Sequence, residues 1–197
     1  MTSKFSPNES KYLSRNPVKQ FLLNKFLFQI CKLVKEINPR TVLDAGCGEG
    51  FIADRLLKIK PSLDYTGLDT SQIAIEKARQ NVKKAKFIIS DINKIPFPNG
   101  NFDLVICLEV LEHLSDPEKG LFQLFRVTNK TALISVPDEP LFSYLRLFAF
   151  SDISKFGRHK EHISFWNKST FPKFLKKKFT RVILFKSLPW LICLAYK

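Results

Sequence analysis

The residues of greatest chemical interest lie in a short turn in which an acid precedes three alternating glycines. Asp44 is followed by Gly46, Gly48 and Gly50, between an apolar stretch and a helix-like stretch. Glycine lets a backbone bend sharply and approach a ligand closely, and the N-terminus of the next helix favours negative charge. The acid before the glycines would repel a pyrophosphate, but it suits a cationic ligand. The turn therefore predicts a site for a nucleotide-like cofactor that carries positive charge.

Two later aspartates also follow apolar stretches. Asp69 comes 19 residues after Gly50, where a carboxylate can accept hydrogen bonds from both hydroxyls of a ribose. Asp91 follows the next apolar stretch. Each has a simpler interpretation as a turn residue or a helix cap.

Acid–base candidates stand in two segments further along the chain. Glu109, Glu112 and His113 follow the fourth expected strand, and His159 and His162 follow the fifth. No surrounding pattern assigns any of them as a catalytic base. The first three stand at i, i+3 and i+4, so they would share one face if that turn is helical. With one of the later histidines they could then bind a divalent metal.

The elements that must position these residues alternate between helix and strand, which indicates an α/β fold. Helices are expected over 17–37, 51–59, 72–82, 117–127 and, with Thr170 as its cap, 171–178; strands are expected over 41–43, 65–68, 86–89, 102–108, 132–136, 181–185 and 191–196. The last two strands are expected to form a hairpin around Pro189 and Trp190.

Bulk composition fits one globular domain. The chain has 197 residues, of which 45% are hydrophobic, and this is enough to bury a substantial core. No apolar run reaches the length of a membrane span, and residues 1–10 are too polar for a signal peptide. Four scattered cysteines form no Cys-x-x-Cys pair, so reduced thiols and a cytoplasmic protein are expected.

The net charge of +14 is concentrated at the two ends of the chain. Residues 1–40 carry +6 and residues 121–197 carry +10, whereas residues 41–120 carry −2. Such basic flanks suit RNA, acidic lipid or a phosphorylated substrate. A solvated lysine-rich surface with no partner explains them equally well.

The glycine turn resembles motif I of the class I S-adenosylmethionine (SAM) methyltransferases. The stretch 95–105 is typical of the methyltransferase type 11 group, which includes ubiquinone-biosynthesis O-methyltransferases, and 107–114 resembles its motif IV. The resemblance extends over residues 38–136, and 187–195 resembles the last hairpin of small bacterial members.

This resemblance implies a Rossmann-like, doubly wound, seven-stranded sheet with helices on both faces and an antiparallel last strand in a C-terminal hairpin. The whole of 1–197 is then one domain. It consists of an N-terminal helical cap (1–37), a SAM-binding core (38–136), a substrate lid (137–168), and a C-terminal helix and hairpin (169–197).

The resemblance also implies the site residues and the reaction. The cofactor-binding residues are expected to be Asp44, Ala45, Gly46, Cys47, Gly48, Gly50, Asp69, Thr70, Asp91, Ile92 and Leu108; the catalytic candidates are Glu109, Glu112, His113 and His162. SAM would donate its methyl group to a small molecule, at oxygen, with no metal. The aromatic and basic lid suits an apolar or anionic acceptor.

Three alternatives remain open at this point. Glu109, Glu112 and His113 with a distal histidine resemble the metal site of small-RNA 2′-O-methyltransferases, and the basic flanks would suit RNA. The same Glu-x-x-Glu-His motif is widespread in metal-free members, however. The chain could also bind SAM without catalysis, or bind nucleic acid without SAM.

Overall fold

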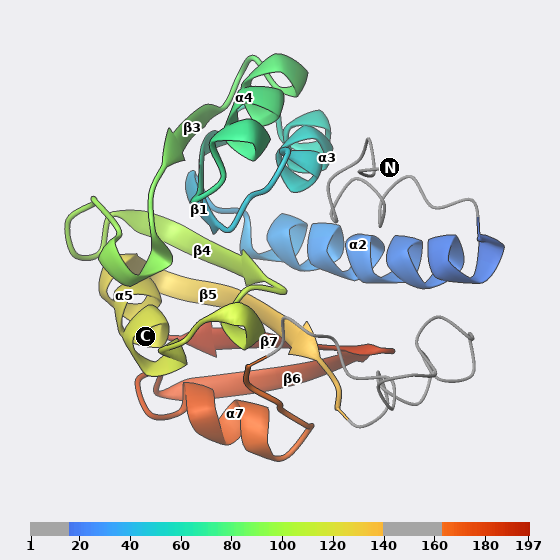
Figure 1. Ribbon diagram of the computed structural model, residues 1–197, viewed down its shortest axis with the longest axis vertical. Coiled ribbons are helices and arrows are strands. Elements are labelled where there is room, and N and C mark those ends of the chain that lie inside the picture. Colours follow the sequence, from blue (N-terminus) through green and yellow to red (C-terminus); the bar gives the residue numbers. More distant parts are fainter. Residues whose placement is uncertain (1–15, 140–162) are drawn as a thin grey trace.

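The computed structural model describes residues 16–139 and 163–197, which form a seven-stranded sheet flanked by helices (Figure 1). The strands are β1 Thr41–Ala45, β2 Asp64–Asp69, β3 Lys86–Ile89, β4 Phe102–Leu108, β5 Thr128–Pro137, β6 Arg181–Ser187 and β7 Trp190–Tyr196. Their order is β3-β2-β1-β4-β5-β7-β6. The first five strands pair in parallel, and β7 pairs antiparallel with both β5 and β6. The expected sheet and C-terminal hairpin are thus confirmed.

Helices cover both faces of the sheet, because successive residues of its strands point to opposite faces and both faces are apolar. The helices are α2 Pro17–Ile37, α3 Phe51–Ile59, α4 Gln72–Asn81, α5 Pro117–Val127 and α7 Thr170–Leu175, with short 3₁₀ turns η1 Ile92–Lys94 and η2 Leu111–His113. Leu104 and Ile106 of β4 pack in the same cluster as α2, α3 and α4. Val105 and Cys107 pack in the cluster of α5 and α7. This period of two is that of a strand buried on both sides.

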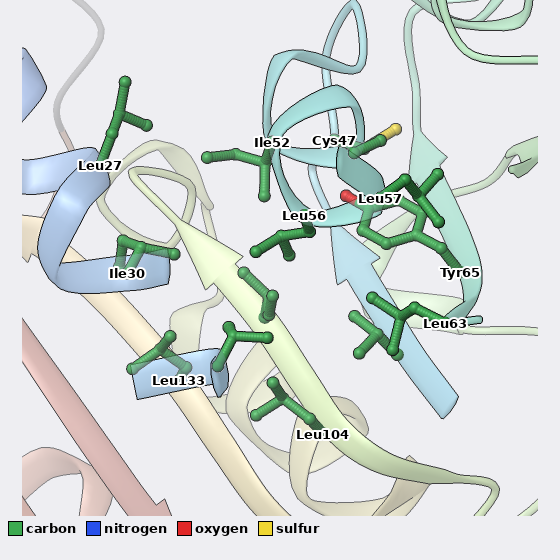
Figure 2. Packing of buried hydrophobic residues seen from close by; sticks show 14 of the residues in the cluster. Leu27, Ile30, Cys47, Ile52, Leu56, Leu57, Leu63, Tyr65, Leu104 and Leu133 are labelled. Carbon is green, nitrogen blue, oxygen red and sulfur yellow. The ribbon is translucent and has the colours of Figure 1, made fainter. Parts of the chain in front are cut away.

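The helix α2 has strong signals at both ends. The Asn16 side chain accepts hydrogen bonds from the backbone N–H groups of Val18 and Lys19, at 3.0 and 3.1 Å, and Pro17 occupies the first helical position. Asn38 ends the helix in the left-handed conformation, with φ of 50°. Figure 2 shows Leu27 and Ile30 on its inner side, in the same cluster as the α3 leucines.

The short helix α7 begins differently from the expectation. Thr170 is not its cap: the position before the helix is Ser169, which makes no side-chain capping hydrogen bond. The Asn167 side chain instead accepts from the N–H groups of Ser169 and Thr170, at 2.9 and 3.0 Å. An Asn two residues upstream therefore supplies the capping oxygen. The helix ends at Leu175 rather than at 178.

Several expected segments fall wholly or partly outside the described residues. These are the first part of the helical cap, most of the lid, and both His159 and His162. Among the helices of residues 16–139 and 163–197, none has the length and apolar character that crossing a membrane requires.

Candidate functional site

The glycine turn between β1 and α3 is held against the end of β2. The N–H groups of Gly46 and Cys47 both donate to the Leu68 carbonyl, at 2.8 and 3.0 Å. Gly46, Gly48 and Gly50 have φ of 87°, 51° and 82°, which glycine adopts far more readily than other residues.

Gly46 is also required by a close approach to the end of β4. A Cβ added to Gly46 would lie 2.3 Å from Cγ2 of Val110, so any larger residue would push the two loops apart. The glycine turn and the loop after β4 therefore meet, at the point where the strand order reverses between β1 and β4. Open α/β sheets bind their ligands at such a switch point.

Asp69, at the end of β2, is fixed by two backbone groups. Gly48 N–H donates to its Oδ2 at 3.0 Å, and Ser71 N–H donates to its Oδ1 at 2.9 Å. Each carboxylate oxygen can accept a further hydrogen bond, since it carries two lone pairs. The carboxylate is thus oriented at the turn and can still accept from a ligand.

Asp44 is an ionisable group buried at the end of β1, with only 3% of its surface exposed. The Tyr65 hydroxyl donates to its Oδ2. Burial raises the pKa of Asp44 from its ordinary 3.8 to about 7, the Tyr65 hydrogen bond opposes this rise, and the negative charge of Asp69 adds to it. A bound cation would favour the ionised form and lower that pKa again.

The end of β4 carries a carboxylate in a strained backbone conformation. Glu109 has φ of 59°, which is uncommon for any residue other than glycine and marks stored strain. Its N–H donates to the Ser135 carbonyl at 3.1 Å, and the buried Ser135 hydroxyl donates to its Oε1 at 2.9 Å. Two bonds from one residue of β5 thus hold Glu109 at the carboxyl edge of the sheet.

Glu112 and His113 do not share a helical face with Glu109, because the turn after β4 is not the α-helix that such a shared face would require. They lie in η2, a single 3₁₀ turn, and Glu109 precedes that turn in a left-handed conformation. Glu112 is 1% exposed, whereas His113 is exposed. Within residues 16–139 and 163–197, no three His, Cys, Asp or Glu side chains gather in a way that could hold a metal ion.

The backbone of Glu112 joins the loop after β4 to the segment that precedes α7. Its backbone carbonyl accepts hydrogen bonds from the N–H groups of Ile163 and Ser164, at 2.8 and 3.2 Å. The segment that leads into α7 is therefore attached to the loop after β4, beside the candidate site.

The remaining expected cofactor residues lie along the same edge. Asp91 follows β3, and its carboxylate caps η1 by accepting from Asn93 N–H at 2.8 Å. Ile92 is buried beside it, Thr70 is exposed after β2, and Leu108 is half-buried at the end of β4. The parallel pairing of β1 to β4 brings all of these residues to the carboxyl edge of the sheet.

Two of the expected cofactor residues, Ala45 and Cys47, have side chains that are buried in the protein core. Ala45 is fully buried in the α5 and α7 cluster, and the Cys47 sulfur lies 2.8 Å from the place a Cβ on Gly67 would take. Burial also raises the pKa of the Cys47 thiol, with the charges of Asp44 and Asp69 adding to the rise. Both residues therefore offer a ligand their backbone rather than a reactive side chain.

Three residues of the site were not found from the sequence. Tyr65 and Ser135 lie within apolar strands, yet each hydroxyl binds a carboxylate of the site. A buried Tyr hydroxyl needs a partner, and that rule could have pointed to Asp44. Val110, which packs on Gly46, carries no such signal.

Comparison with known proteins agrees with this geometry. The family model described as a methyltransferase domain matches residues 38–182. Demethylmenaquinone methyltransferase from Thermotoga maritima is 34% identical over 122 residues, which cover 61% of this chain and 53% of that protein. 2-Methyl-6-phytyl-1,4-hydroquinone methyltransferase 1 from Oryza sativa subsp. japonica is 31% identical over 134 residues, covering 66% and 40%. The chain thus spans about half the length of these curated relatives, or less.

Solved structures share the fold at lower identity. The plantazolicin methyltransferase, solved in complex with S-adenosylhomocysteine, superposes with a TM-score of 0.75 at 20% identity and covers 98% of this chain and 91% of its own. The expected resemblance to methyltransferases is therefore confirmed. Because the family model covers well over half of its residues, this chain belongs to the methyltransferase domain family, with the fold of the class I SAM-dependent methyltransferases.

Proposed function

We propose that this chain binds SAM at the carboxyl edge of its sheet and transfers the methyl group to a small-molecule acceptor. The observation that carries the proposal is the pairing of a buried, ionisable Asp44 with an oriented Asp69 at the glycine turn. SAM carries an ammonium group and a sulfonium but no phosphate. A turn that carries Asp44 and Glu49, lies beside Asp69 and has no basic side chain over residues 44–50 suits such a ligand.

Four of the expected cofactor residues take roles that follow from their positions. Asp44 faces the methionine part of SAM, where positive charge compensates its burial. Asp69 accepts from the two ribose hydroxyls with the lone pairs that Gly48 and Ser71 leave available. Asp91 and Ile92 contact the adenine, the first by hydrogen bonding and the second by packing.

The transfer itself requires positioning more than chemical activation, because a sulfonium methyl is a strong electrophile. An acceptor atom held in line with the S–CH₃ bond forms the new bond to carbon, the S–C bond breaks, and S-adenosylhomocysteine leaves. A neutral hydroxyl acceptor must also lose its proton. Glu109 is well placed for this step, since Ser135 fixes its carboxylate at the same edge.

We therefore propose methylation at oxygen, with the acceptor proton passing to Glu109. An apolar phenolic acceptor is consistent with the relatives, one of which is named for a hydroquinone that carries a phytyl chain. A phenol could also react at a ring carbon after the same deprotonation. The product distinguishes the two outcomes, because one is a methyl ether and the other a ring-methylated phenol.

Calorimetric titration with S-adenosylhomocysteine tests the cofactor site first. We expect micromolar binding that Asp44→Asn weakens at least tenfold, a loss of about 1.4 kcal/mol or more. Asp54→Asn is the matched control, since Asp54 lies on the surface of α3 in an ion pair with Lys58. No binding by the unmodified protein, or equal binding by both variants, would reject the proposed site.

Transfer of labelled methyl from SAM to a set of phenols then tests the reaction. Glu109→Gln should abolish most of the transfer while leaving S-adenosylhomocysteine affinity unchanged. The same assay with Mg²⁺, Mn²⁺ or a chelator, and with short RNA as acceptor, tests the metal-dependent alternative. Metal-stimulated methylation of RNA that His113→Ala abolishes would replace the small-molecule proposal.

A further inference from the structure

The outer side of α2 carries large apolar residues that contact solvent. Phe21 and Phe28 are 61% and 70% exposed, and Val18 is 65% exposed. At about 100° per residue, Phe21 and Phe28 lie directly opposite the buried stripe that includes Leu27 and Ile30. A helix that packs on a sheet normally presents polar residues there, so this face needs a different explanation.

Lysines accompany the exposed phenylalanines on the same face. Lys25 lies between them, with its Nζ 5.3 Å from the centre of the Phe21 ring, and Lys32 follows Phe28 by one turn. Residues 17–37 contain four lysines and a single acid, Glu36. Phenylalanine next to lysine on one exposed face provides both the apolar contact and the cationic contact that a lipid–water interface offers a helix.

The direction of α2 relates this face to the candidate site. The Phe26 ring lies 4.9 Å from that of Trp190, and Trp190 pairs with Pro137 at the carboxyl end of β5. At its other end, Ile37 lines a depression with Tyr196 and Asp103, near the amino ends of β4 and β5. The helix thus runs antiparallel to β5, and its first turns lie toward the edge that carries the glycine turn (Figure 1).

We infer that the face of α2 formed by Val18, Phe21, Lys25, Phe28 and Lys32 docks this protein on an anionic lipid surface. The phenyl rings enter the headgroup boundary, and the lysine ammonium groups pair with lipid phosphates. Four lysines against a single acid make anionic lipid the complementary partner of α2, and the exposed rings of Phe21 and Phe28 supply the apolar contact that a headgroup boundary accepts. Docking would hold the carboxyl edge of the sheet near the bilayer, where an apolar acceptor would dissolve. The docking itself does not depend on the proposed reaction.

Vesicle flotation without any cofactor or acceptor tests this inference. We expect the full chain to float with vesicles containing about 30% phosphatidylglycerol in phosphatidylcholine, and to bind pure phosphatidylcholine at least tenfold more weakly. Binding should fall steeply as salt rises from about 0.05 M to about 0.5 M. The double variant Phe21→Ser with Phe28→Ser should lose at least tenfold in partitioning.

Matched controls separate docking from general stickiness and from misfolding. Ile73→Ser with Phe122→Ser removes two exposed apolar side chains from α4 and α5 and should leave vesicle binding unchanged. The α2 double variant should keep the melting temperature of the parent, because its two side chains lie outside the core. S-adenosylhomocysteine affinity should also be the same in both variants, so failure of docking and failure of the cofactor site are distinguishable.

Three results would overturn the inference. One is no flotation of the unmodified protein with anionic vesicles. Another is retained flotation of the α2 double variant. The third is a complex that the α2 substitutions abolish while the unmodified protein does not bind vesicles. If that complex is a dimer in sedimentation equilibrium, the face binds a second copy of the chain; if it contains RNA, the face binds nucleic acid.

Discussion

Replacing Asp44 by Asn should make the cofactor-free protein more stable above neutral pH, although it removes a residue of the site. The substitution keeps an oxygen that can accept from Tyr65 but removes the buried negative charge. The pKa of Asp44 rises from 3.8 to about 7 on folding. At 1.36 kcal/mol per pH unit, ionisation of Asp44 lowers the free energy of unfolding by on the order of 4 kcal/mol.

The sign of the pH dependence follows from proton binding. Between about pH 4 and pH 7 the folded protein keeps a proton on Asp44 that the unfolded chain has already lost. The contribution of Asp44 to the free energy of unfolding therefore falls as pH rises through that window, and it stays low above the window. The advantage of Asp44→Asn should be near zero at about pH 4 and reach its full size above about pH 7.

Urea unfolding of the parent and of Asp44→Asn, at about pH 4.5 and about pH 8, measures this difference directly. Asp54→Asn again serves as control, and should change stability by less than about 1 kcal/mol at both pH values. Saturating S-adenosylhomocysteine should stabilise the parent at about pH 8 and the Asp44→Asn variant much less. An Asn variant that is less stable than the parent at about pH 8, or equally shifted at both pH values, would refute the reasoning.

Three further predictions concern neighbouring features. Gly46→Ala should lower the free energy of unfolding by about 3 kcal/mol, because its Cβ would meet Val110. Gly100→Ala should lower it by only about 1 kcal/mol, because Gly100 has φ of 65° but no atom closer than 4.0 Å to the added Cβ. Equal losses of the two variants in urea unfolding would contradict this reasoning. Ser135→Ala should slow methyl transfer about tenfold through loss of its bond to the Glu109 carboxylate, and a parallel loss of S-adenosylhomocysteine affinity would indicate a merely structural role. Burial raises the pKa of all four thiols, and only Cys31 is partly exposed. At most one cysteine should therefore react quickly with a disulfide reagent at about pH 8. Fast reaction of two cysteines would show that the core opens.

Most elements could be predicted from the sequence because their boundaries have local chemical causes. The bounds of α3, β3, β4 and α5 agree with the expectation residue for residue. The Ser71 hydroxyl accepts from Ala74 N–H at 3.3 Å and caps α4, as expected. Proline, Asn and Ser signals act within a few residues, and the parallel strands are continuous apolar runs.

The sequence predicts the acidic residues of the site but not the residues that hydrogen-bond to them. Asp44 and the glycines stand in one motif, and Asp69, Asp91 and Glu109 each follow an apolar strand. Their partners lie elsewhere in the sequence: Tyr65 binds Asp44, and Ser135 binds Glu109. The turn after β4 shows the same limit. Its Glu-x-x-Glu-His spacing suits an α-helix, but the strained conformation of Glu109 and a 3₁₀ turn place those side chains in different surroundings. Tertiary contacts override local spacing there.

The position of β7 has a consequence for how this sheet assembles during synthesis. β5 and β6 both hydrogen-bond to β7 and not to each other. Until residues 190–196 have been made, one side of the β5 backbone is unpaired, and Ile134 and Val136 lack their lateral neighbours Cys193 and Leu191. Such an open, apolar strand edge is the usual starting point of aggregation. Solubility during expression should therefore depend on the β7 sequence far more than a strand of seven residues would suggest.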